Sequence, residues 1–158
     1  MAADIFLEIE GLKGESIVES HKDQIDCDSW SWGASNASSM QRGGGGGVAK
    51  GDCHPLNVTG AIDKASPEFW KKVMKGEHFE KATLYARKAG GGDPIDYVKI
   101  EMTKMYVAGW NVSGSSNSGM QSLSMTFEEV TFTYTGQNDD GSPKEPVEVH
   151  YNIGAMTD

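Results

Sequence analysis

Two stretches decide the fold of this chain: VKIEMTKMYV at residues 98–107 and LSMTFEEVTFTY at residues 123–134. Apolar residues alternate with polar ones along both, which is the pattern of a β-strand with one buried face. Each alternation changes phase once, between Met102 and Met105 in the first stretch and between Phe127 and Val130 in the second. A phase change is typical of a bulge or bend, and long bent strands favour a barrel over a flat sheet.

The same alternation predicts shorter strands at residues 5–9, 25–27, 56–62, 82–86 and 147–153. Stretches rich in Gly, Ser, Asn and Asp predict loops at about 33–51, 109–119 and 137–146. The first loop is longer than an ordinary connection, which indicates either a contact arm or a disordered excursion.

One segment has helical spacing. Ser66 is the expected N-cap and Pro67 the expected first helical residue, and Gly76 ends the helix, so we predict a helix over residues 66–75. Its apolar stripe pairs residues four apart, Phe69 with Val73 and Trp70 with Met74. The predicted fold is therefore mainly β: a single antiparallel β-barrel or two-sheet barrel, with one amphipathic α-helix packed at its side.

Length and charge narrow the function. The 158 residues fit one domain, residues 1–158, with a sizeable core. A formal net charge of −9 makes nucleic acid and anionic membrane surfaces poor partners. The start of the chain lacks the pattern of a secretory signal and no apolar run is long enough to span a bilayer, so we expect synthesis in the cytosol. Cys27 and Cys53 are accordingly expected to be reduced thiols.

Sites for chemistry are weakly indicated. Gly43 to Gly47, followed by Lys50, matches no phosphate-loop spacing, because no hydroxyl residue follows the lysine. The four histidines and two cysteines show no paired-ligand spacing for zinc. Glu128 and Glu129 are adjacent in a predicted strand, so we expect them to point to opposite faces and not to share a site. We expect no catalytic, cofactor-binding or metal site.

Aromatic residues suggest packing or assembly instead. The tryptophans could form a platform for a sugar or peptide, but core or subunit-interface positions are the favoured interpretation. The residues assigned to core or interface are Trp30, Trp32, Phe69, Trp70 and Val73.

Several motifs, in this order, resemble the Hcp family, the haemolysin-coregulated tube proteins of bacterial type VI secretion systems. They include DIFLEI at residues 4–9, IDCDSWSWG at residues 25–33, the glycine run 43–47, IDKASP at residues 62–67 and ARKAGG at residues 86–91. The resemblance extends over nearly the whole chain. It implies a homohexameric ring and a tube of stacked rings that carries effector proteins in its lumen.

The resemblance also implies partners and residue roles. The tube would be capped by a VgrG-type spike, driven by a contractile sheath, and exported from the bacterial cytoplasm without a cleaved signal peptide. The residues that would form the ring-stacking loop are Ser35, Asn36, Ser38, Met40, Gln41, Arg42, Gly43, Gly44, Gly45, Gly46, Gly47 and Lys50. The candidates for the lumen lining are Ser113, Ser115, Ser116, Asn117, Lys104 and Glu101.

Two other functions stay open at this point. A monomeric small β-barrel could bind a ligand or peptide in its own cavity, which predicts one large pocket and no ring. A hydrolase could use Cys53 with His54, although no neighbouring basic residue is placed by the sequence to lower the pKa of the Cys53 thiol.

Overall fold

The structure, a computed structural model, describes residues 4–36, 51–88 and 94–158. Its elements in chain order are β1 (Ile5–Ile9), a 3₁₀ turn (Glu19–His21), β2 (Ile25–Cys27), β3 (Ser29–Ser31), β4 (Ala34–Ser35), β5 (Asp52–Cys53), β6 (Leu56–Ala61), α1 (Ser66–Lys75), β7 (His78–Lys88), β8 (Ile95–Gly114), β9 (Gly119–Tyr134) and β10 (Val147–Asn152). None of the helices in these residues is long and apolar enough to cross a membrane.

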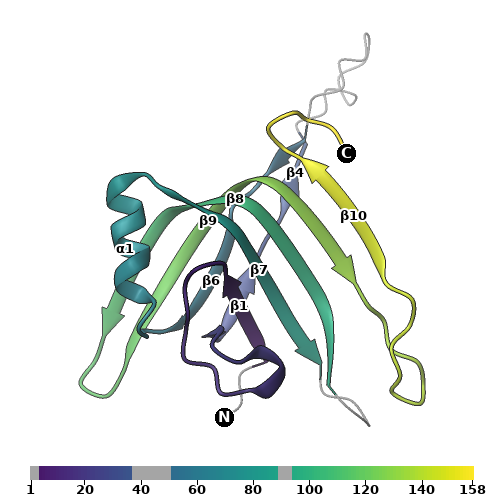
Figure 1. Ribbon diagram of the computed structural model, residues 1–158, viewed down its shortest axis with the longest axis horizontal. Coiled ribbons are helices and arrows are strands. Elements are labelled where there is room, and N and C mark those ends of the chain that lie inside the picture. The colour runs from purple at the N-terminus through teal and green to yellow at the C-terminus, as the bar shows by residue number, and fades with distance from the viewer. Residues whose placement is uncertain (1–3, 37–50, 89–93) are drawn as a thin grey trace.

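Eight strands form one antiparallel sheet in the order β2-β1-β7-β8-β9-β6-β3, with β10 also paired to β9. The long strands β8 and β9 run through the middle of this sheet, with α1 near one end and β10 near the other (Figure 1). The N-terminal half of β9 pairs with β6 and its C-terminal half with β10. The mainly β fold, with one α-helix in the described part of the chain, confirms the sequence prediction.

One short segment brings the two edges of the sheet together. Residues 25–27 pair with β1, and residues 29–31, directly after them, pair with β6. Between them, the Asp28 N–H donates to the Thr59 carbonyl at 2.7 Å. Gly60 makes this approach possible, because a Cβ at Gly60 would lie 2.7 Å from the Asp26 carbonyl oxygen. The sheet therefore curls into a nearly closed barrel whose seam lies at residues 25–31.

The barrel interior is apolar and filled with side chains. Its largest fully buried members come from strands all around the sheet: Leu7, Ile25, Leu56, Leu84, Ile100, Met102, Met105 and Met125. Cys27 is buried with them, and both it and Cys53 are free thiols, as predicted. Removing this apolar surface from water is the main term that stabilises the fold.

Both predicted phase changes are present, and they lie opposite each other. Met102 pairs with Val130 and Met105 with Phe127, and all four are buried. Two residues of each strand stand between these pairs outside the core, so Glu128 and Glu129 both leave the core face. Strict alternation does not hold across the irregularity, and the two carboxylates have different partners, Lys104 for Glu128 and His150 for Glu129.

The helix has the predicted bounds, but its N-cap is not the predicted residue. Ala65, with helical backbone angles, is the N-cap, and Ser66 is the first helical residue. The Ser66 hydroxyl accepts a hydrogen bond from the Asp63 N–H at 3.0 Å and donates to Gln121 Oε1 at 2.8 Å, so it does not cap the helix. Gly76 ends the helix with a φ of 66°, in the left-handed region that glycine favours.

The predicted loop at 109–119 is mostly strand. β8 continues to Gly114 and β9 begins at Gly119, so only residues 115–118 form the turn, closed by the Ser115 N–H donating to the Ser118 carbonyl at 2.8 Å. Pairing along two long strands outweighs the weak β propensity of Gly, Ser and Asn in this stretch. At the start and end of the predicted 33–51 loop, β4 and β5 form a separate two-stranded sheet.

Candidate assembly surfaces

Cys53, the nucleophile in the hydrolase alternative, is not activated by its surroundings. The Cys53 Sγ lies 3.8 Å from the His54 carbonyl oxygen, while the His54 ring is hydrogen-bonded to the Ser35 hydroxyl at 2.9 Å. Burial and the nearby Asp52 carboxylate raise the pKa of the Cys53 thiol, with a hydrogen bond from Trp32 acting in the other direction. Because the thiolate is the nucleophile, this environment does not favour a cysteine hydrolase.

The other histidines have separate partners. His21 is buried, with Nε2 2.8 Å from Asp96 Oδ1 and Nδ1 2.9 Å from Gln24 Oε1. His78 lies 2.7 Å from Glu80, and His150 lies 3.3 Å from Glu129. Within the described residues, no group of three or more His, Cys, Asp or Glu side chains is arranged to hold a metal ion.

The tryptophans divide into two groups. Trp30 and Trp32 are partly buried against the core, where the Trp32 ring stacks on Phe132 with centroids 5.7 Å apart. In the helix, Phe69 is fully buried and Val73 packs partly against the core. Trp70 is 54% exposed and is not a core residue, which leaves the subunit interface as its alternative.

The candidate lumen residues fall in two places. Glu101 and Lys104 lie on β8, where Glu101 pairs with Lys99 at 3.0 Å and Lys104 with Glu128 at 3.4 Å. Ser113 lies one residue before the end of the same strand, while Ser115, Ser116 and Asn117 belong to the turn of the β8–β9 hairpin. The structure therefore does not bring these six residues into one cluster.

A largely polar surface covers the outside of the central strands, interrupted by Tyr106, which pairs with Thr126 and is 42% exposed. On β9 most of the residues facing away from the core are small and hydroxyl-bearing, the exceptions being Met120, Glu128 and Glu129, and direct pairing places residues of β6 and β8 beside them. We call this surface the polar sheet face; it comprises Asn57, Thr59, Lys99, Glu101, Asn111, Ser122, Ser124, Thr126, Thr131 and Thr133. The signal for this surface in the sequence is Ser or Thr at alternate positions within residues 122–126 and again within 131–133.

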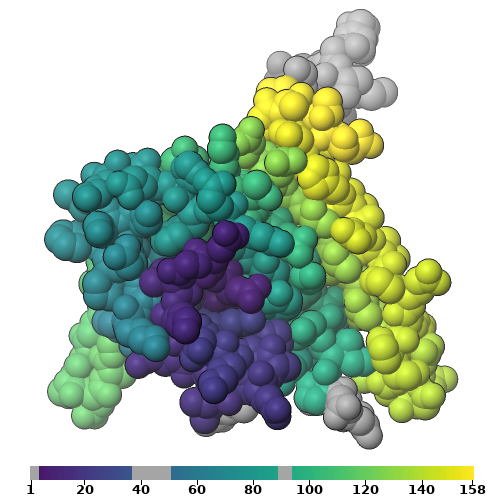
Figure 2. Space-filling view, in the orientation of Figure 1, coloured from purple at the N-terminus to yellow at the C-terminus, as the bar shows by residue number. Residues whose placement is uncertain are grey.

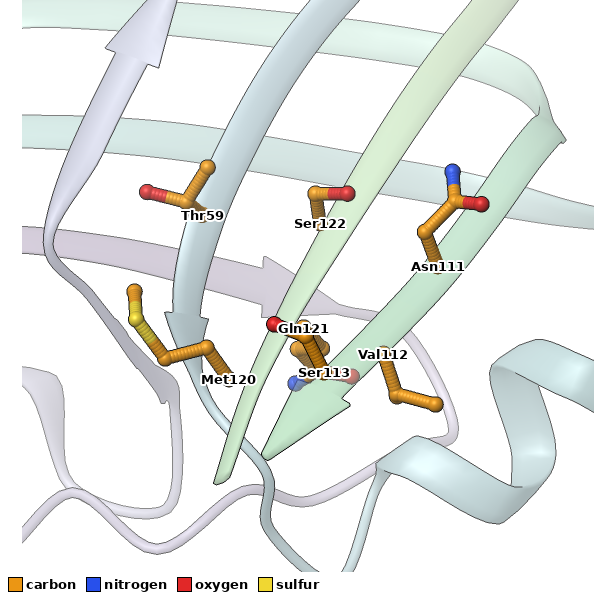
Figure 3. Close-up of a pocket in the computed structure, with 7 residues that line it drawn as sticks. All are labelled: Thr59, Asn111, Val112, Ser113, Met120, Gln121 and Ser122. Atoms are coloured by element: carbon orange, nitrogen blue, oxygen red, sulfur yellow. The ribbon is translucent and has the colours of Figure 1, made fainter. Parts of the chain in front are cut away.

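A shallow pocket of about 200 Å³ lies at one end of this face. Thr59, Ser122 and Asn111 stand side by side across β6, β9 and β8, as direct register partners (Figure 3). Met120 and Val112 form the apolar part of the lining, and both are more than 40% exposed. The arrangement offers hydroxyl and amide groups to water or to a passing polar surface, and it holds no acid–base pair.

The stacking-loop prediction lies largely outside the described residues. Of its members, Ser35 is in β4 and Asn36 follows it, and both are exposed. Ser38, Met40, Gln41, Arg42, Gly43 to Gly47 and Lys50 all fall within 37–50, which the structure does not describe.

Comparison with known proteins identifies the class. Residues 6–134 match the family described as "Type VI secretion system effector, Hcp". Protein hcp1 of Pseudomonas aeruginosa is 35% identical over 156 residues, which is 97% of this chain and 96% of that protein. The crystal structure of Hcp1 from Salmonella typhimurium is similar with a TM-score of 0.80 at 32% identity, over 99% of each chain. A structure described as a type six secretion system protein has a TM-score of 0.90 over 99% of each chain, at 23% identity, and supports the fold alone.

These matches define a component of a type VI secretion system. Within that class, the family match over most of the chain and the 35% identity along nearly its full length decide the family. The chain belongs to the Hcp family.

Proposed function

We propose that this chain is the subunit of a secretion tube, in which six copies form a ring and rings stack around a lumen that carries effector proteins. The tube would be capped by a VgrG-type spike, propelled by a contractile sheath and exported from the bacterial cytoplasm. Family membership supports the setting. The observation that carries the proposal is the polar sheet face, which we assign to the lumen.

A lumen that passes varied cargo needs a wetted wall that binds nothing tightly. The small hydroxyls of Ser122, Ser124, Thr126, Thr131 and Thr133 hold water and exchange hydrogen bonds with many partners, and they present no large apolar patch. The apolar residues of the same strand point into the barrel, where Leu123, Met125 and Phe127 are buried. One strand thus separates the core from the wall.

The monomeric binding module is less well supported. It requires a cavity inside the barrel, whereas Leu84, Ile100 and Met102 are fully buried in close contact in that interior. The pocket of Figure 3 opens on the outer, polar side of the sheet instead.

Light scattering after size exclusion tests the ring. A mass near six chains at high concentration is expected, and a persistent single chain would contradict the proposal. Ser124→Arg then tests the lumen: the ring mass should be retained while an effector that binds the wild-type ring is no longer retained. Unchanged effector binding by this variant would refute the assignment of the polar sheet face.

Stacking is tested separately by deleting Gly43 to Gly47. Rings of unchanged mass are expected, with fewer or shorter tubes in electron micrographs of concentrated samples. Tubes of normal length would show that this segment is not needed for stacking.

A further inference from the structure

β10 carries an uncovered apolar face. Val147, Val149 and Tyr151 occupy alternate positions and are 64%, 64% and 41% exposed. They pair directly with Tyr134, Phe132 and Val130 of β9, so they extend the core side of the sheet beyond the barrel. Val130 is buried and Phe132 packs against the core, but Tyr134 is 48% exposed. The side chains on this face therefore become more exposed toward the C-terminal end of β9.

The backbone of β10 is also open on one side. Within the described residues its partner strand is β9, and only its last residue, Asn152, also bridges Thr157, so most of its other side is an open edge. Monomeric proteins normally protect such an edge with charges, bulges or a covering element, and contiguous exposed apolar surface typically marks an interaction site. The open face of β10, formed by Tyr134, Val147, Val149 and Tyr151, is therefore suited to a partner with an apolar surface of its own.

α1 presents such a surface at the opposite end of the molecule. Trp70 and Met74 are four residues apart on its outer side and are 54% and 70% exposed. Lys71 and Lys75 lie next to them and are also exposed. In Figures 1 and 2 the helix lies at the left and β10 along the right edge, so a single copy cannot bring the two surfaces together.

The two surfaces have complementary charge. α1 contains three lysines and one glutamate, although the chain as a whole has a net charge of −9. Residues 137–148, leading into and through the first part of β10, contain Asp139, Asp140, Glu145 and Glu148 with a single lysine, Lys144. Lys72 is paired with Glu77 at 3.1 Å and Lys71 lies 3.9 Å from Glu68 of the same helix, so among the described residues it is Lys75 that is left on the outer side to meet an acidic partner.

We infer that the open face of β10 docks on the outer face of α1 of the next copy, and that this is the side-to-side contact of the ring. The inference rests on the ring of the proposed function. Two different surfaces at opposite ends make a heterologous contact, which repeats from copy to copy and closes into a ring when the rotation allows it. Apolar anchors ringed by opposite charges are the usual composition of such an interface.

Two single variants and their mixture test this contact. Val149→Asp disables the β10 face and keeps α1 intact, whereas Trp70→Asp disables the α1 face and keeps β10 intact. Both side chains are more than half exposed, so circular dichroism of each variant should match the wild type. Ile17→Asp is the matched control, because Ile17 is 94% exposed and belongs to neither face.

Each single variant is expected to fall from about six chains to one by light scattering, while Ile17→Asp keeps the wild-type mass. An equimolar mixture of the two variants retains one complete contact and should give a species of two chains at high concentration. Single variants that still form rings, or a mixture that remains at one chain, would overturn this contact. A wild-type protein that is itself a single chain would instead overturn the ring of the proposed function.

Discussion

Gly60→Ala is expected to destabilise the protein at the barrel seam. The added Cβ would lie 2.7 Å from the Asp26 carbonyl oxygen and 3.3 Å from the Cys27 Cα. Both are backbone atoms, so no side-chain rotation relieves the contact, and the seam must move by several tenths of an ångström. The hydrogen bond from the Asp28 N–H to Thr59 resists that movement. Overpacking of this kind costs about 1–3 kcal/mol.

Gly109→Ala is the matched control in β8. Its Cβ would meet only the Ser124 Cβ at 3.7 Å, an ordinary contact, and its φ is outside the left-handed region. This variant should be unchanged or more stable by about 0.4–1 kcal/mol, because alanine reduces the entropy of the unfolded chain. Urea denaturation of both variants is to be measured where each is a single chain, because assembly adds apparent stability.

A loss of about 2 kcal/mol lowers the urea midpoint by about 1 M when m is about 2 kcal/mol/M. If Gly60→Ala matched Gly109→Ala in midpoint, the seam would not be closed by the backbone approach described above.

Three further changes follow from the same structure. Phe69→Ala should cost about 3–5 kcal/mol in the free energy of unfolding, because Phe69 is fully buried. Trp70→Ala should cost about 1 kcal/mol, since half of that side chain is already in water. Equal losses of stability in thermal denaturation of single chains would contradict the faces assigned to these two residues. Burial, with the Asp26 carboxylate adding to it, raises the pKa of the Cys27 thiol from 9.0 to about 12, so the folded state retains this proton more strongly. The resulting stability is complete below pH 9 and is lost as pH rises toward 12; Cys27→Ala should lack this part of the alkaline decline, and a thiol reagent at pH 8 should label Cys27 only after unfolding. Lys104 has a φ of 51°, so Lys104→Val should be about 1–2 kcal/mol less stable than Lys104→Gly, and equal urea midpoints would refute a left-handed backbone at this position.

The strands and the helix could be predicted because their signals are local. Alternation along residues 98–107 and 123–134, and Pro67 and Gly76 at the ends of the helix, depend on neighbours within a few residues. The apolar stripe predicted for the helix is wider than the face that packs against the barrel. Phe69 and Trp70 both begin pairs spaced by four residues, and only packing against the barrel decided that Phe69 is buried.

The assembly surfaces could not be predicted by the same means. Val147, Val149 and Tyr151 alternate as regularly as Leu56, Val58 and Gly60, yet the residues of β10 are exposed and those of β6 are buried. Alternation identifies two faces of a strand, but it does not state whether another element of the same chain covers the apolar one. That depends on where β9 stops pairing with β6 and starts pairing with β10, which is a property of the whole sheet.

The paired irregularity in β8 and β9 explains how one sheet keeps a continuous core on one side and a largely polar surface on the other. A bulge in a single strand shifts the register, and β8 contains such a shift further along, between Val107 and Gly109, outside the paired irregularity. At the paired irregularity the register on either side is unchanged, because Met102 pairs with Val130 and Met105 with Phe127. Both strands change phase together, and the Lys104–Glu128 ion pair at 3.4 Å joins them on the outer side. The sheet can therefore bend into a barrel at this level without placing any charged residue in the core or any core residue on the polar sheet face.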